Sequence, residues 1–184
     1  MKRVIVITGT PCSGKTTISK KVSRMLPSCE LISANDLVKG KRLFTGYSRD
    51  GEMVADMRKL SAEIGRRVRS SGRDVVIVEG HLLCDLKVRG AVAVTVREHL
   101  NTLLSRMRRR GYKQRKIEDN IVAEAIDYCG VNSAGNYVDA YEVESGPGAE
   151  REILAVIGGR AKPKAIDMLG ELNGILKKLG KAAI

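Results

Sequence analysis

The chain has 184 residues, enough for one domain to bury about two-thirds of its unfolded surface without disulfides or metals. Its 33 Lys and Arg residues against 21 Asp and Glu residues give a formal charge of +12, typical either of a protein with anionic partners, such as nucleotides or RNA, or of a merely solvated surface. Four scattered cysteines argue against a disulfide framework, and without a signal peptide or an apolar run of roughly 20 residues we expect a cytoplasmic protein.

The first apolar run, residues 4–7, predicts a buried strand, and a glycine-rich segment follows it. Residues 9–16 read GTPCSGKT and fit the phosphate-binding pattern G-x-x-x-x-G-K-[ST] at every fixed position. Gly9 and Gly14 let the backbone N–H groups point toward phosphates. Lys15 would hold the β- and γ-phosphates, and Thr16 would offer its hydroxyl to Mg²⁺. The strand before this segment and the helical pattern after it favour a nucleoside triphosphate site over an ordinary glycine turn.

Apolar runs and helical patterns then alternate along the chain. Helices are predicted at residues 15–26, 53–71, 98–110 and 117–126. Pro27, Gly72 and Gly111 would end the first three helices, and Gly130 would follow the last. Further strands are predicted at residues 31–32, 75–78, 92–96 and 140–143. This order predicts an α/β fold with a doubly wound, parallel five-stranded sheet flanked by helices.

A polar and basic segment separates the second strand from the next helix. It contains Asn35, Asp36, Lys39, Lys41, Arg42, Tyr47 and Arg49. Such a segment could hold a phosphoryl acceptor, with Asp36 as a substrate-binding candidate. Asp36 fits the cap of a helix equally well.

Two polar residues follow the third strand, at the carboxyl end where open α/β sheets bind their ligands. Glu79 could orient water or Mg²⁺ there, beside Thr16. His81 could position an attacking water or a phosphate, and an ordinary hydrogen-bonding role is an equal alternative.

A cluster of basic residues follows the fourth strand. Arg106 and Arg110 are four residues apart and therefore share one helix face. Around them lie Arg108, Arg109, Lys113, Arg115 and Lys116. So many like charges suit a polyphosphate, whose oxygens the guanidinium groups can meet, which makes Arg106 a substrate-binding candidate. A solvated helix and a patch that binds RNA phosphates remain alternatives.

An apolar stripe followed by lysines predicts an amphipathic helix over residues 163–180. Its apolar positions are Ile166, Leu169, Leu172, Ile175, Leu176 and Leu179. The stripe would pack on the parent domain or bind a partner. Since no linker divides the chain, we expect one domain over residues 1–184.

Four segments together resemble one family. They read GTPCSGKTT (9–17), SANDL (33–37), VVIVEGH (75–81) and RMRRRGYKQRKIEDNI (106–121). They are similar to the isoenzyme-six branch of adenylate-kinase-type proteins, archaeal and nuclear nucleoside monophosphate kinases linked to small-ribosomal-subunit maturation. The resemblance covers residues 1 to about 157. It implies a P-loop kinase domain with an NMP-binding insertion at about 35–57 and a lid at about 109–119. The C-terminal amphipathic helix at about 163–180 is an extra element, onto which the resemblance carries no function.

The same resemblance implies an adenylate kinase, or a broader nucleoside monophosphate kinase, that catalyses ATP + AMP = 2 ADP and also hydrolyses ATP. Lys15, His81 and Arg110 would be catalytic. Mg²⁺ would be held by Thr16 and Glu79, although some members carry Asp at the second position. The residues that would line ATP are Cys12, Ser13, Gly14, Lys15, Thr16, Thr17 and Arg110.

A second hypothesis is an ATPase assembly factor for the small (30S or 40S) ribosomal subunit. The resemblance implies a platform ribosomal protein, uS-eleven, and pre-ribosomal RNA as its partners, and we expect no membrane partner. A GTPase is disfavoured because no [NT]-K-x-D segment occurs. A shikimate-type kinase is disfavoured because no second Asp follows Asn35 and Asp36. The acceptor among AMP, CMP and UMP stays open.

Overall fold

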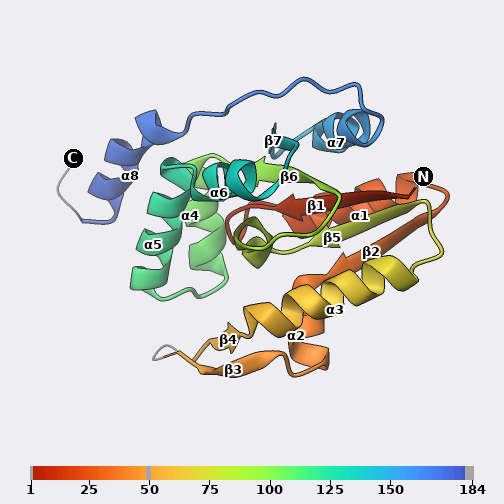
Figure 1. Ribbon diagram of the computed structural model, residues 1–184. Coiled ribbons are helices and arrows are strands. Elements are labelled where there is room, and N and C mark those ends of the chain that lie inside the picture. Colours follow the sequence, from red (N-terminus) through yellow and green to blue (C-terminus); the bar gives the residue numbers. More distant parts are fainter. Residues whose placement is uncertain (1, 49–50, 181–184) are drawn as a thin grey trace.

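Five parallel strands form the centre of the computed structural model, which describes residues 2–48 and 51–180 (Figure 1). They are β1 (Arg3–Thr8), β2 (Cys29–Ser33), β5 (Val75–Glu79), β6 (Ala91–Arg97) and β7 (Ala140–Glu144), in the order β2-β5-β1-β6-β7. All five predicted strands and the doubly wound sheet are thereby confirmed. The chain leaves β1 toward one edge of the sheet and β5 toward the other, so a crevice opens beyond the carboxyl ends of these two strands.

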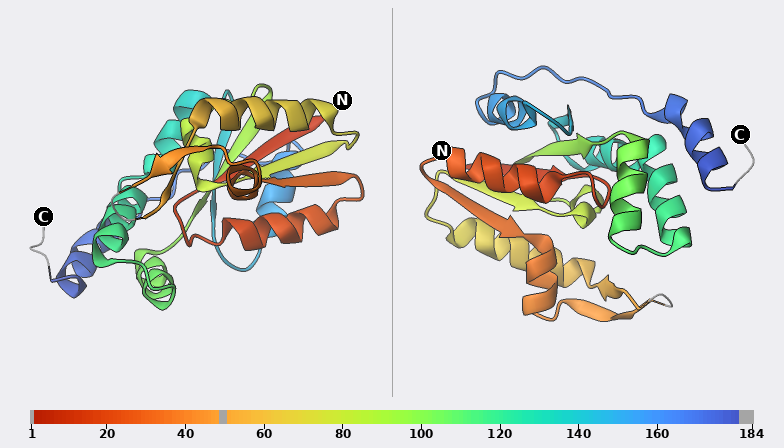
Figure 2. Two further views of the ribbon diagram at one scale, coloured as in Figure 1. Left: turned by 90° about the horizontal axis from the view of Figure 1, so that it is seen from below. Right: turned by 180° about the vertical axis from the view of Figure 1, so that it is seen from behind.

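Both faces of the sheet are covered, which explains the unbroken apolar runs of its strands. Val4 and Val6 of β1 pack toward α2 (Ala34–Gly40) and α3 (Met57–Ser70). Ile5 and Ile7 pack on the opposite face toward α1 (Lys15–Met25) and α7 (Ala149–Ile157). Figures 1 and 2 show α3 and α1 on opposite sides of the sheet. The alternation of side chains along a strand thus builds two cores from one sequence run.

The predicted helix at 53–71 begins four residues late. Residues 53–55 form β4 (Met53–Ala55), which pairs antiparallel with β3 (Phe44–Tyr47) in a small separate hairpin. Asp56 then caps α3, because its Oδ1 accepts a hydrogen bond from the Lys59 N–H at 3.0 Å. At the other end the Lys2 ammonium donates to the Val68 and Ser71 carbonyls, and α3 ends at Ser70 before it reaches Gly72.

The region around Gly130 contains two helices, whereas the sequence predicted one, at residues 117–126. After α4 (Leu100–Arg109), α5 (Gln114–Ala125) ends and α6 (Tyr128–Asn136) begins. Asp127 separates them with a left-handed backbone (φ 55°) and caps α6 through its Oδ1, which accepts from the Gly130 N–H at 3.1 Å. The helix predicted at 117–126, before Gly130, is thus confirmed as α5, and Gly130 itself lies in a second helix, α6, that was not predicted.

The predicted helix at 163–180 is shorter in the structure. It consists of the 3₁₀ turn η2 (Leu169–Glu171) and α8 (Leu172–Lys178), which an irregular segment joins to α7 (Figure 1). Pro163 disfavours a helix in this segment, and the Ile166 N–H donates to the Glu142 carboxylate at 2.8 Å. Leu172, Ile175 and Leu176 of α8 pack against α4 and α5. Within residues 2–48 and 51–180, none of the helices has the length and apolar character that crossing a membrane requires.

Candidate active site

The glycine-rich segment forms a tight loop between β1 and α1, directly at the carboxyl end of β1. Gly9, Cys12 and Gly14 have left-handed backbones, with φ of 139°, 73° and 96°. A Cβ on Gly9 would lie 2.4 Å from the Val96 carbonyl oxygen, so only glycine fits there. The Ser13 N–H closes the loop by donating to the Thr10 carbonyl at 3.1 Å.

Lys15, the first residue of α1, folds back over this loop. Its side chain is buried, and its ammonium donates to the Thr10 carbonyl at 3.1 Å. Burial lowers the pKa of Lys15, and the carboxylate of Glu79 is the strongest of the groups that oppose this shift. A carbonyl is a neutral acceptor, so an anionic phosphate would be a stronger partner for this ammonium.

Thr16 and Glu79 meet across the crevice between β1 and β5. The Thr16 hydroxyl donates to Glu79 Oε2 at 2.9 Å, and the Glu79 side chain is buried at the carboxyl end of β5. A hydroxyl oxygen beside a carboxylate is a donor set of the hard oxygen type that Mg²⁺ prefers, with its remaining positions left for water and phosphate oxygens. The predicted metal pair is therefore close in space and chemically suited to Mg²⁺.

His81 begins η1 (His81–Asp85), the 3₁₀ turn that follows β5. Its carbonyl accepts hydrogen bonds from the Thr8 hydroxyl and the Cys84 thiol, both at 3.3 Å. Burial, with smaller contributions from the positive charges of Lys15 and Lys116, lowers the pKa of His81 to about 4. The imidazole is therefore neutral at pH 7.

Arg106 and Arg110 both reach Cys12 from α4 and the turn after it. Arg106 Nη1 donates to the Cys12 carbonyl at 3.0 Å and pairs with the buried Glu98 carboxylate at 2.8 Å. Arg110 Nη1 lies 3.3 Å from Cys12 Sγ, which is a weak acceptor. The two guanidinium groups thus flank the loop from one helix face, and among the residues that the structure describes, Arg106 pairs with a carboxylate there, that of Glu98.

Asp36 lies apart from this group, on the exposed side of α2. Its backbone N–H donates to Ser33 Oγ at 3.3 Å, so Ser33, and not Asp36, caps the helix. With Ser33, Lys41 and Arg67, Asp36 lines a cavity of about 310 Å³ beside β2. The segment between α2 and α3 approaches α5, because Lys116 forms an ion pair with Glu52.

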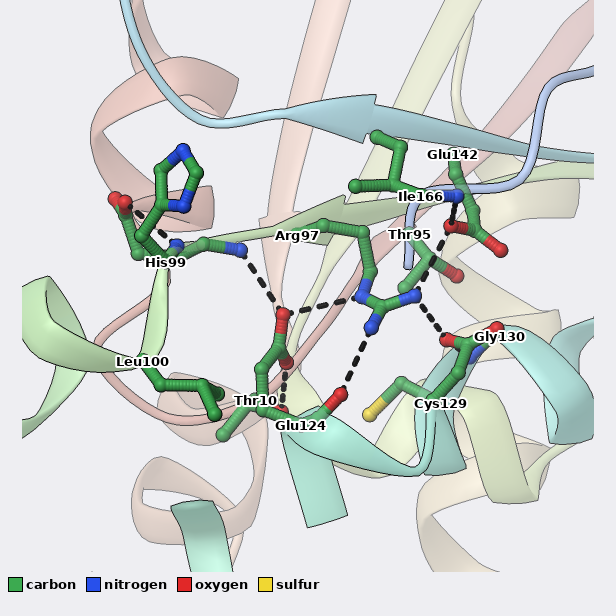
Figure 3. A network of polar contacts seen from close by, with 12 residues as sticks. Thr10, Thr95, Arg97, His99, Leu100, Glu124, Cys129, Gly130, Glu142 and Ile166 are labelled. Carbon is green, nitrogen blue, oxygen red and sulfur yellow. Dashed lines mark hydrogen bonds and ion pairs between the residues drawn. The ribbon is translucent and has the colours of Figure 1, made fainter. Parts of the chain in front are cut away.

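A buried network of polar contacts, which the sequence did not predict, holds the loop against α5 (Figure 3). The Glu124 carboxylate of α5 accepts hydrogen bonds from the Thr10 hydroxyl, the Glu98 N–H at 2.9 Å and Arg97 Nε at 3.0 Å. Arg97 and Glu124 are each 1% exposed. This network joins the loop, the end of β6 and α5.

Arg97 has two further carboxylate partners in the network. Its Nη1 lies 2.6 Å from Asp127 Oδ1 and 3.0 Å from Glu142 Oε2. Burial raises the pKa of Asp127 to about 6 against the opposing charge of Arg97. The signal for Arg97 and Glu124 lies in their positions: Arg97 is the last residue of the apolar strand β6, and Glu124 falls on the buried face of α5 with Ile117 and Ile121.

Comparison with known proteins places this geometry in a family. Residues 5–127 match the family model described as AAA domain. A Thermococcus onnurineus protein named "Putative adenylate kinase" is 31% identical over 157 residues, 84% of this chain and 81% of its own length. A Methanocaldococcus jannaschii protein of the same name is 32% identical over 142 residues, 77% and 76% of the two chains.

Solved structures show the same fold at low identity. Shikimate kinase from Bacteroides thetaiotaomicron superposes with a TM-score of 0.55 at 19% identity, covering 85% of this chain and 98% of its own. The tunicamycin resistance protein of Deinococcus radiodurans has a TM-score of 0.59 at 19% identity, covering 90% and 100%. With the glycine-rich loop, these similarities establish the α/β P-loop NTPase fold.

Proposed function

This chain belongs to the AAA-domain family and to the kinase-type family of these archaeal relatives, and from that premise we propose that it is an adenylate kinase that transfers the γ-phosphoryl group of Mg-ATP to AMP. The observation that carries the proposal is the convergence of Lys15, the Thr16–Glu79 pair and two arginines on one phosphate loop. It also fits the isoenzyme-six branch that the sequence resembles.

The loop would bind the donor triphosphate. Its backbone N–H groups and the Lys15 ammonium would hold the phosphates, with residues 12–17 lining them. Thr16 and Glu79 would hold Mg²⁺, which supplies charge neutralisation between the phosphates when bound. Phosphoryl transfer needs mainly positioning and electrostatic stabilisation, and these residues supply both.

Arg110 is the better candidate for contact with the transferred group. Its present partner at the loop, a sulfur atom, is readily replaced by a phosphate oxygen, whereas Arg106 already has a buried carboxylate and a carbonyl. We therefore assign Arg110 to stabilisation of the charge that develops on the phosphoryl oxygens. Arg106 positions the loop, and a direct contact with the substrate is the alternative role for it.

The acceptor would lie between the insertion at 35–57 and the lid at 109–119. The Lys116–Glu52 ion pair joins these two segments, so an acceptor beneath it would be shielded from water. His81 is neutral and follows the metal-binding strand, so it could take a proton from water when the acceptor is absent. This chemistry would give the slower ATPase activity.

The test is a coupled assay of ADP formation from Mg-ATP, with and without AMP, on the unaltered chain, Lys15→Ala and Lys20→Ala. Lys20 is an exposed lysine on the same helix and serves as the matched control. We expect AMP to stimulate ADP formation, and Lys15→Ala to lower the stimulated rate at least 100-fold while Lys20→Ala keeps it. ADP formation that ignores AMP would overturn the kinase assignment.

One observation favours a second candidate, an ATPase assembly factor for the small ribosomal subunit. Arg108, Arg109 and Arg110 are exposed beside the lid of a chain with a net charge of +12, as suits contact with RNA phosphates. In that role the partners would be the platform protein uS-eleven and pre-ribosomal RNA. Hydrolysis independent of AMP, together with salt-sensitive co-sedimentation with small subunits, would favour it.

A further inference from the structure

Two thiols lie against each other beneath the proposed nucleotide site. Cys84 of η1 and Cys129 of α6 are 45 positions apart in the sequence, yet their sulfur atoms are 3.5 Å apart. Cys84 is 1% exposed and Cys129 is 7% exposed, so both lie in the interior. The other two cysteines lie elsewhere, Cys12 in the phosphate loop and Cys29 at the start of β2.

We propose that Cys84 and Cys129 are a redox-active pair that a hydroperoxide converts into a reversible disulfide. A disulfide requires a sulfur–sulfur distance of about 2.05 Å, so the two atoms must approach each other by about 1.5 Å. The pairing itself does not rest on the proposed function. Only its effect on ATP turnover does.

The structure already holds the two elements in place for this bond. The Tyr137 hydroxyl donates to the Leu83 carbonyl at 2.7 Å, and Asn136 Nδ2 donates to the Cys84 carbonyl at 2.8 Å. These bonds fix η1 against the C-terminal end of α6. Closing the disulfide therefore needs small side-chain rotations and no separate docking of the two segments.

The oxidation proceeds in two balanced steps. The Cys84 thiolate attacks one oxygen of hydrogen peroxide, the O–O bond breaks, and a sulfenic acid forms while the departing hydroxide takes up a proton as water. The Cys129 thiol then attacks the Cys84 sulfur, the S–O bond breaks, and a second water leaves as the S–S bond forms. The two thiols lose two electrons and two protons in total, and a dithiol reductant returns them by exchange.

The environment distinguishes the attacking thiol from the resolving one. The hydrogen bond with Cys129 lowers the pKa of Cys84, in spite of its burial. That same bond and burial raise the pKa of Cys129, and the positive charge of Lys15 only partly opposes this shift. Cys84 is thus the more nucleophilic partner near neutral pH, and Cys129 keeps its proton until the second step.

Oxidation would alter the segment that carries His81. The Cys84 thiol donates to the His81 carbonyl at 3.3 Å, and a disulfide has no S–H with which to keep that bond. The Thr8 hydroxyl would remain as a donor to this carbonyl. If the proposed kinase function holds, we expect the oxidised protein to turn over ATP at least threefold more slowly, and a dithiol to restore the rate.

The test treats the full reduced chain with hydrogen peroxide, blocks remaining thiols with iodoacetamide and maps the peptides by mass spectrometry. We expect a peptide pair joined through Cys84 and Cys129, and the free thiols to fall from four to two. Cys84→Ala and Cys129→Ala should each abolish the link, whereas the control Cys29→Ala should keep it. The closed loop should also raise the melting temperature by about 5 °C or more.

Two results would overturn the proposal. One is four free thiols after peroxide treatment that oxidises a reference dithiol peptide completely, and the other is a disulfide formed only with Cys12 or Cys29. Peptide mapping of the unaltered chain decides this even if a variant fails to fold. If the chain forms the Cys84–Cys129 disulfide but shows no AMP-stimulated ADP formation, the proposed function is contradicted and the proposal of a redox-active pair is not.

Discussion

Glu124 of α5 connects the phosphate loop to the end of β6. Its carboxylate accepts hydrogen bonds from three donors on two segments: the Thr10 hydroxyl of the phosphate loop, and the Arg97 guanidinium and the Glu98 N–H at the end of β6. A buried ion pair gains little over an apolar pair of the same shape, but removing one partner leaves the other charge uncompensated. The intact network therefore changes the free energy of unfolding little, whereas removal of one charged partner lowers it strongly.

We predict that Glu124→Gln destabilises the chain by about 3 kcal/mol, because the new amide turns a donor toward another donor and leaves Arg97 short of one negative charge. Urea unfolding measures the change. The matched control is Glu152→Gln, whose partner Lys164 is exposed, and it should unfold at the unaltered midpoint. Equal midpoints for the two variants would contradict the assigned role of Glu124.

Among the site residues, the sequence predicted those that belong to a short motif with fixed spacing. Gly9, Lys15 and Thr16 fall within eight positions, so one motif predicts the whole loop. Glu124 and Thr10 are 114 positions apart, and only folding brings them together. A single acidic residue in a helix is normally predicted to be exposed, because buried carboxylates are rare. Only its position on the apolar face of the helix indicates burial.

Among the elements, α8 stands out because it packs against both α4 and α5. Ile175 is 1% exposed and shares a cluster with Leu103 of α4 and Ile117 of α5. Glu171, just before α8, accepts hydrogen bonds from the Leu100 N–H at the start of α4 and from His99. The C-terminal segment thus stabilises both α4 and α5.

We predict that Ile175→Ala lowers the free energy of unfolding by about 2–4 kcal/mol, through the lost apolar contacts and the cavity that remains. Hydrogen exchange should speed up most in α4 and α5. The exposed Lys177 is the matched control, and Lys177→Ala should change neither quantity. Unchanged exchange in α4 and α5 would show that α8 does not stabilise these two helices.

Hydrophobic periodicity predicted the five strands of the sheet and the helices α1, α3, α4, α5 and α8, but it did not predict α2, the β3–β4 hairpin, α6 or α7, nor the ends of the elements. The runs at residues 4–7 and 75–78 were the plainest signals, because four apolar residues in a row suit a strand with two covered faces. The boundaries at 56 and 127 are set by Asp56 and Asp127, whose side chains cap the next helix. A single capping residue leaves no periodic signal, and so these two boundaries were missed.

In the whole molecule, the two histidines respond to pH in opposite directions. The pKa of His81 is lowered to about 4, mainly by burial. The pKa of His99 is raised, mainly by its hydrogen bond with Glu171, and Glu144 adds to the shift. The His81 contribution is present above pH 6.5 and is lost as the pH falls toward 4. The His99 contribution is present below pH 6.5 and is lost as the pH rises through its folded-state pKa.

We predict that the unaltered chain loses about 3 kcal/mol more stability than His81→Gln between pH 6.5 and pH 4, since a lowering of about 2.5 pKa units corresponds to that free energy. Urea unfolding at several pH values measures the difference, in which the titration of shared carboxylates cancels. His99→Gln should show the reverse: the unaltered chain loses stability relative to it only above pH 6.5. Parallel curves for all three proteins would contradict both shifts.

The hydrogen bond between Thr10 and Glu124 couples phosphate binding at the loop to the docking of α5. Binding free energies are reciprocal: whatever factor the docked α5 adds to the affinity of the loop for a phosphate, a bound phosphate adds to the docking of α5. A ligand that occupies only the loop will therefore slow amide exchange across α5. If the proposed kinase function holds, binding of the phosphoryl donor alone would already stabilise α5, before any acceptor is bound.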